Sequence, residues 1–216
     1  MAFLTDVFKV AGLVQSGRRA LLKKDFASAL SNFAQAAEKD PGYIVTAVHL
    51  REGVLTYLGR AQYAVGRWAQ ARRSFERALA AFSDDVLARL YLGAALVRGG
   101  DELRGVFELQ KGLQALRDWI EDIRRARPFE DFWDPNGQIR GEIQRVLDLI
   151  ARKRFDREQL LASVEWIGDT VEEEMDRVRW DETANISDAA RVGDHRPFTD
   201  LLRSCYVAAL EFNYQE

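Results

Sequence analysis

The residue types that most often carry out chemistry are scarce in this chain and do not occur at catalytic spacings. There are two histidines, His49 and His195, and one cysteine, Cys205. Neither histidine belongs to an E-x-x-H or H-E-x-x-H sequence, the spacing with which one helix face holds iron or zinc. Cys205 stands among apolar residues at helical spacing, which favours a buried thiol over a nucleophile. We therefore predict no catalytic residue, no metal site and no cofactor, and we do not expect an enzyme.

One acidic run is the remaining candidate for a metal site. It comprises Glu172, Glu173, Glu174 and Asp176. A solvated helix face explains such a run more simply than a cation site. An enzyme or metal site in the C-terminal helices is thus the least favoured of the functional hypotheses.

The composition is typical of a globular protein and gives no strong electrostatic preference. The 216 residues are 47% hydrophobic and 30% charged, with a net charge of −3. This length allows one or two domains with a substantial core, and the small net charge gives no drive toward nucleic acid. Residues 1–14 are apolar but are interrupted by Asp6 and Lys9, so we expect neither a signal peptide nor a membrane span. With only one cysteine, a cytoplasmic location is expected.

A period of 34 residues organises the first half of the chain. Four pairs of residues recur at this offset: Leu58 and Leu92, Ala71 and Gly105, Phe75 and Leu109, and Ala78 and Gly112. An earlier set with the same internal spacing is shifted by 42 residues. A fixed period of this length predicts paired helices stacked as a solenoid. The eight extra residues fall after Pro41, where we expect them to lengthen the next helix by about two turns.

This pattern resembles the tetratricopeptide repeat (TPR) family, with about three repeats in residues 10–118. The family places small residues at three positions, an aromatic residue at a fourth and often a proline at the end. The first copy matches with Gly17, Ala29, Phe33, Ala36 and Pro41, and the second with Gly59, Ala71, Phe75 and Ala78. The third copy departs from the pattern, because Leu109 replaces the aromatic residue and Arg117 the proline. The resemblance implies an all-α fold, a helical-hairpin solenoid followed by a C-terminal helical hairpin and a capping helix.

Three regions are expected along the chain. Residues 1–127 form the repeat array with the helix that follows it, and 138–216 form a C-terminal helical region. Between them, residues 128–137 contain two prolines, a glycine and three aromatic residues. We expect this stretch to be a linker that packs against the protein.

Within the C-terminal region we predict a helical hairpin. Asp156 and Gln159 resemble a capping box, so a turn near Phe155 should fold two helices against each other. Residues 181–196 are polar and are expected to form a mobile loop. A last amphipathic helix should then begin at Pro197.

The resemblance also implies a binding groove, because the first helix of each repeat turns a set of side chains toward the concave surface. Here these are Gln15, Arg18, Tyr57, Arg60, Tyr63, Tyr91 and Arg98. Tyrosine and arginine provide large contact areas and forked hydrogen bonds at interfaces. The implied partner is a protein or peptide with aromatic or aliphatic and acidic residues. Alternatively, several of these side chains pack against the next repeat.

The leading functional hypothesis is a non-enzymatic adaptor or scaffold that helps to assemble a larger complex. The excess of arginine over lysine is typical of a GC-rich bacterial genome. Residues 210–216 combine aromatic and acidic side chains, so this tail could dock in the groove or join protomers. The alternative is a regulatory protein controlled by a peptide or by nucleic acid. Nucleic-acid binding is not expected, because neighbouring acids offset basic clusters such as Arg124–Arg127.

Overall fold

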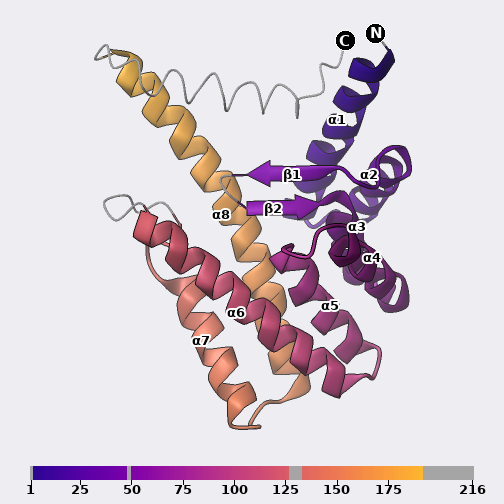
Figure 1. Cartoon of the computed structure of the whole chain (residues 1–216), viewed down its shortest axis with the longest axis vertical. Coiled ribbons are helices and arrows are strands. Elements are labelled where there is room, and N and C mark those ends of the chain that lie inside the picture. Colours follow the sequence, from indigo (N-terminus) through magenta and orange to yellow (C-terminus); the bar gives the residue numbers. More distant parts are fainter. Residues whose placement is uncertain (1, 48–49, 127–132, 192–216) are drawn as a thin grey trace.

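The protein is predominantly helical in the computed structural model, which describes residues 2–47, 50–126 and 133–191 (Figure 1). In chain order the elements are α1 (Ala2–Leu22), α2 (Phe26–Lys39), β1 (Ile44–Ala47), β2 (Leu50–Gly53), α3 (Val54–Ala64), α4 (Trp68–Ala81), α5 (Val86–Arg98), α6 (Glu102–Ala126), α7 (Gln138–Ala151) and α8 (Arg157–Arg191). The prediction of a mainly helical protein is confirmed, although two strands interrupt it. None of the helices in the described ranges combines the length and the apolar character that crossing a bilayer requires.

The first six helices pack as three consecutive pairs, α1 with α2, α3 with α4 and α5 with α6. Each pair is joined by a short turn in which a backbone N–H reaches back to a carbonyl five residues earlier. The middle residue of the turn has a positive φ, which is 58° at Lys24, 76° at Gly66 and 92° at Gly100. This is the Schellman geometry, which glycine adopts without strain but lysine does not. The three turns therefore share one backbone conformation.

A small residue faces a large one at the same place in each pair. The partners are Gly17 with Phe33, Gly59 with Phe75, and Gly93 with Leu109. A Cβ atom at any of the three glycines would overlap its partner side chain, and all three large side chains are fully buried. The sequence period therefore corresponds to a recurring close approach of two helices.

The residues inserted after Pro41 form a β-hairpin. Strands β1 and β2 are antiparallel, and Val45 lies opposite Glu52 in the register. The expectation of a longer next helix is therefore wrong, because α3 begins only at Val54. β-Branched residues such as Ile44 and Val45 lose side-chain freedom in a helix and fit a strand better.

The start of α3 is held by a carboxylate from the next helical pair. Asp85 accepts hydrogen bonds from the Gly53 backbone N–H at 2.8 Å and from the Thr56 hydroxyl at 2.7 Å. Its other oxygen accepts the Ala88 N–H at 2.8 Å and thereby caps α5. Asp85 thus connects the hairpin to two helices.

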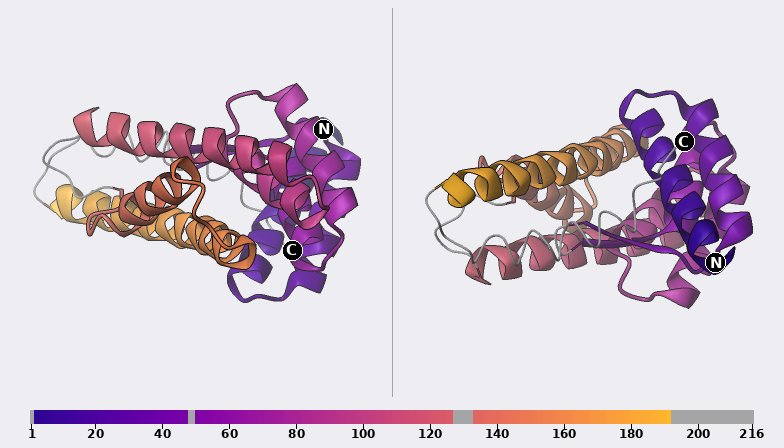
Figure 2. Two further views of the ribbon diagram at one scale, coloured as in Figure 1. Left: turned by 90° about the horizontal axis from the view of Figure 1, so that it is seen from below. Right: turned by 90° about the horizontal axis from the view of Figure 1, so that it is seen from above.

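The last three helices pack together, with α7 between α6 and α8 (Figure 2). The Gln159 backbone N–H donates to Asp156 Oδ1 at 3.0 Å, which confirms the predicted cap and turn near Phe155. Helix α8 continues to Arg191, so the prediction of a loop from residue 181 is wrong up to that point. Residues 181–191 contain no proline or glycine and include three alanines, which favours a helix. Residues 192–216, with the predicted last helix and acidic tail, lie outside the described residues.

The predicted packed linker is described only from Trp133 onward. Trp133 is fully buried, and its ring meets that of Trp119 edge-on with centroids 4.9 Å apart. Asp134 is also buried and accepts the N–H groups of Ile139 at 2.9 Å and Arg140 at 3.0 Å. This end of the linker therefore fixes the start of α7.

Candidate functional site

Helix α8 covers one side of α1, α3 and α5, the first helices of the three pairs, and contacts each of them. We call this covered surface the inner face. It is carried by residues of α1, α3 and α5 that contact α8, namely Arg18, Arg60, Tyr63, Tyr91 and Arg98. A segment more than 50 residues further along the chain than α5 therefore occupies the expected groove.

The structure places the predicted groove residues on these three helices, but it does not leave them open. Arg18, Tyr57, Arg60, Tyr63 and Tyr91 are buried, while Gln15 and Arg98 are half-buried. The expectation of an open groove lined by these residues is therefore wrong. The physical reason is that α8 packs over this surface and supplies carboxylates to four of the side chains, Arg18, Arg60, Tyr63 and Arg98.

A buried carboxylate joins the first two helical pairs to α8. Glu172 accepts a hydrogen bond from Arg18 Nε at 2.6 Å and another from Arg60 Nη1 at 2.8 Å. All three side chains are at most 5% exposed. Burial alone would raise the pKa of Glu172, but the charges of Arg18 and Arg60 outweigh it and hold the pKa below its ordinary value.

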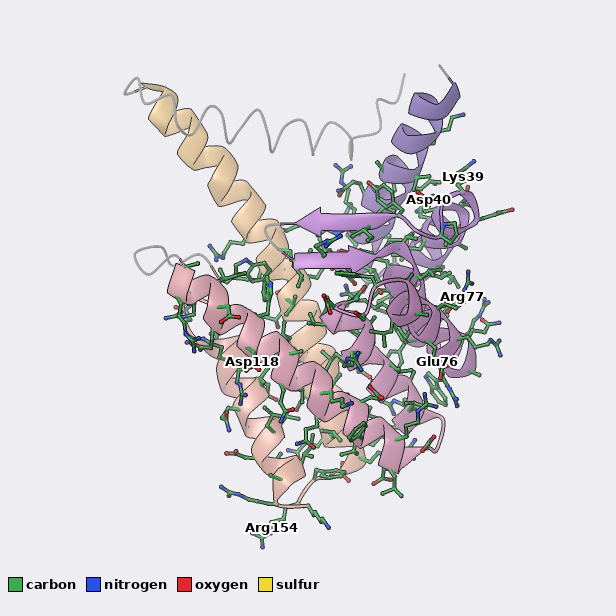
Figure 3. All side chains as sticks on the ribbon, viewed as in Figure 1. Lys39, Asp40, Glu76, Arg77, Asp118 and Arg154 are labelled. Atoms are coloured by element: carbon green, nitrogen blue, oxygen red, sulfur yellow. The ribbon has the colours of Figure 1, made fainter. Side chains whose placement is uncertain are left out.

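The prediction that the acidic run forms a solvated helix face is wrong for Glu172, although Glu173 is exposed. Most other charges do lie outside. Figure 3 shows Arg77 on α4 and Arg154 after α7 pointing away from the protein. The Arg18, Arg60 and Glu172 cluster is thus a buried exception. Buried charges need partners, and this cluster provides them.

Arg60 is the centre of a second set of contacts. Its guanidinium lies 5.5 Å from the ring centroid of Tyr57 and 5.3 Å from that of Tyr91. Its Nη1 also donates to Glu52 Oε1, on β2, at 3.1 Å. Burial raises the pKa of Glu52 to about 8, against the opposing charge of Arg60. Glu52 therefore keeps its proton well above the pH at which an exposed glutamate loses it.

Nearer the start of α8 the contacts become more exposed. Tyr63 Oη donates to Glu165 Oε1 at 2.7 Å, and Arg98 donates to Glu165 at 3.4 Å and also to Glu158. Arg98 is 24% exposed, Glu165 41% and Glu158 65%. The hydrogen bonds and ion pairs to α8 are consequently buried near Glu172 and partly solvated toward the N-terminal end of the helix.

Sequence reasoning missed the acidic half of this site. The α8 residues are Glu158, Glu165 and Glu172, seven residues apart, and Glu52 joins them from β2. A spacing of seven is close to two helical turns, so the three glutamates lie on one face of α8. That spacing is the sequence signal that could have indicated them.

A cavity remains between α8 and the helical pairs. Its volume is about 330 Å³, and it lies beside the C-terminal ends of α1 and α3. On the side of the helical pairs it is lined by residues that include Leu21, Leu22, Phe26, Tyr63 and Trp68. On the side of α8 its lining includes Glu165, Asp169 and Glu173. Helix α8 therefore covers the inner face without filling it.

The groups gathered here are suited to binding carboxylates, because guanidinium and phenol groups donate to every glutamate of the α8 row. Among the described side chains, no three His, Cys, Asp or Glu residues come together as a metal ion would require. Comparison of the chain with family models, with curated proteins and with solved structures gave no match in any of the three.

Proposed function

We propose that this protein is a non-enzymatic interaction scaffold, built from tetratricopeptide-type repeats, that binds a partner protein on its inner face and helps to assemble a larger complex. One observation carries the proposal. The inner face already holds a helix, through a row of glutamates received by arginine and tyrosine donors from all three helical pairs. A surface that binds one helix in this way has the chemistry to bind another.

The repeat architecture is supported by two features that recur in all three pairs. The turns share a positive φ at their middle residue, and a glycine approaches a large side chain at the same place in each pair. Stacked helical pairs of this kind commonly present one continuous binding surface. We expect such a scaffold to act in the cytoplasm of a bacterium.

The position of α8 adds control to the proposed scaffold. Because α8 covers the inner face, a partner must compete with it, and binding becomes coupled to the release of α8. This observation favours a regulated adaptor, controlled by a peptide segment, over one that is permanently open.

The test is to recover partners of the tagged full-length protein from its source cells and to quantify them by mass spectrometry. The double variant Glu158→Gln and Glu165→Gln weakens the exposed end of the α8 contacts, so it should recover more partner than the wild type. Adding Arg98→Gln and Tyr63→Phe removes inner-face donors and should reduce recovery. Arg125→Gln, an exposed change on α6, is the matched control and should have no effect. Equal recovery by all variants would refute the role of the inner face.

A further inference from the structure

The fit of α8 on the inner face is incomplete on one side. The cavity of about 330 Å³ is lined on the side of the helical pairs by apolar and aromatic side chains together with three cations, Lys24, Arg60 and Arg98. From α8 it receives four acidic side chains, Glu165, Asp169, Glu172 and Glu173, of which Asp169 is the shortest. Trp68, which lines the same cavity, is 40% exposed. The apolar side chains of this wall share the cavity with carboxylates, so they lack the complementarity of a packed interface.

Asp169 itself is weakly held. Its nearest cation is Lys24 Nζ at 3.9 Å, and the two side chains are 58% and 73% exposed. An ion pair with this exposure and distance contributes little to stability. Replacing Asp169 by an apolar side chain would therefore lose little stability and would add apolar surface to the cavity that Trp68 also lines.

The residue before Asp169 is constrained in a different way. A Cβ atom on Gly168 would overlap the hydroxyl of Tyr91. Arg60 Nη2 also donates to the Gly168 carbonyl at 3.4 Å. A helix seated as α8 is seated therefore needs glycine at this position, while the next position can accommodate a large side chain.

From these contacts we infer that the inner face is shaped for a partner helix that carries glutamates at the positions of Glu158, Glu165 and Glu172, glycine at that of Gly168, and a large apolar side chain at that of Asp169. Helix α8 is the weaker occupant, which such a partner displaces. In sequence the partner reads Glu-x6-Glu-x2-Gly-apolar-x2-Glu. This inference rests on the proposed function and names the class of partner.

Displacement needs a partner that binds the inner face more tightly than α8 does. The additional binding free energy comes from apolar contacts that the partner makes in the cavity. A leucine at the Asp169 position removes apolar surface of its own and of the wall from water. The glutamate contacts are the same for α8 and for the partner, so they set register and do not favour either helix. Near the start of α8 these contacts are partly solvated, which lets exchange begin there.

The inference is tested with fluorescent synthetic peptides and the full-length protein. The reference peptide has the sequence of residues 157–177, and the test peptide carries Asp169→Leu. We expect the leucine peptide to bind about threefold to tenfold tighter, the effect of partly burying one large aliphatic side chain. A peptide with Asp169→Ala is the matched control for helix propensity and should gain much less. A leucine peptide that also carries Glu165→Gln and Glu172→Gln should lose most of its affinity.

The same change in the protein should have the opposite effect. In full-length Asp169→Leu, α8 gains the same apolar contact, so the leucine peptide should bind about threefold to tenfold more weakly than to the wild type. Asp169→Asn is the control and should leave peptide binding unchanged. Equal affinity of the leucine and alanine peptides, or binding that is insensitive to the glutamates, would overturn the inference. Native mass spectrometry that shows peptide-sensitive dimers would overturn it in favour of α8 exchange between two copies.

These results can be separated from the test of the proposed function. Partner recovery that depends on Arg98 and Tyr63, together with no preference for the leucine peptide, would leave the scaffold standing and remove the partner class. The reverse result, peptide preference without any recovered partner, would support the chemistry of the inner face and contradict the scaffold.

Discussion

Arg60 Nη1 donates to Glu172 Oε2 at 2.8 Å, and 112 residues of sequence separate the two. This hydrogen bond joins α3 to α8 and lies where solvent is excluded. Arg18, on α1, shares the same carboxylate. One side chain of α8 therefore compensates two buried positive charges from different helical pairs, and this has consequences for stability.

Removing this carboxylate should destabilise the fold strongly. Glu172→Ala leaves Arg18 with Asp176 as its anionic partner and Arg60 beside Glu52, which is mainly protonated at neutral pH. We expect the free energy of unfolding to fall by about 3 kcal/mol, because uncompensated buried charge is costly. Urea denaturation measures this change. The adjacent Glu173→Ala, at an exposed site, should change it by no more than about 0.5 kcal/mol, and similar losses in both variants would contradict the cluster.

The buried Glu52 predicts a pH dependence. Its pKa lies at about 8 in the folded protein against an ordinary value of 4.5. Between these values the folded state holds a proton that the unfolded state has released, so the free energy of unfolding falls as the pH rises through this window. Glu172 has a lowered pKa, so its contribution is lost only as the pH falls below 4.5, outside the window.

Glu52→Gln tests this dependence, because glutamine stays neutral at every pH. Urea midpoints measured across the window should fall less steeply in the variant than in the wild type. Parallel curves for the two proteins would show that Glu52 does not titrate as described.

The close approach of paired helices predicts opposite effects at two glycines. Gly59→Ala places a methyl group against the ring of Phe75 and should cost about 1–3 kcal/mol of stability through overpacking. Gly141→Ala, on an exposed side of α7 with no heavy atom within 4 Å, should stabilise by about 0.5–1 kcal/mol through helix propensity. Thermal unfolding of both variants and of the wild type measures these changes in stability. A tolerated Gly59→Ala would mean that α3 and α4 are further apart than described.

The strained turn at Lys24 predicts a stabilising substitution. Its φ of 58° is left-handed, whereas the corresponding turns carry Gly66 and Gly100. Lys24→Gly should raise the free energy of unfolding by up to about 1 kcal/mol by relieving this strain. The neighbouring Lys23→Gly has no such strain to relieve and should destabilise instead, so equal effects of the two changes would contradict the turn geometry.

The repeat period predicted the packing of helical pairs because that packing is local. The large residue of each pair contacts the helix directly before its own, and its spacing from the glycine there is visible in the sequence. These large residues are Phe33, Phe75 and Leu109. The β-hairpin was missed because the eight inserted residues lie between predicted helices and were therefore expected to be helical as well. Their β-branched composition was the contrary signal.

The inner face was predicted only in part. The resemblance to tetratricopeptide repeats indicated Arg18, Arg60 and Tyr91, but it carried no information on what covers them. The cover comes from α8, whose Glu172 has the same local sequence character as the exposed Glu173. Burial of one and not the other is decided by contacts more than 100 residues away, which local patterns do not encode.

The glutamates of α8 also connect neighbouring helical pairs to each other. Glu172 contacts the first and second pairs, and Glu165 contacts the second and third through Tyr63 and Arg98. Chains of helical pairs ordinarily touch only their nearest neighbours, so their ends can fray independently. Here the single helix α8 contacts all three pairs, so its detachment weakens the contacts between each pair and the next. The protein should therefore melt in one all-or-none step while α8 is seated, and pair by pair once it has been displaced.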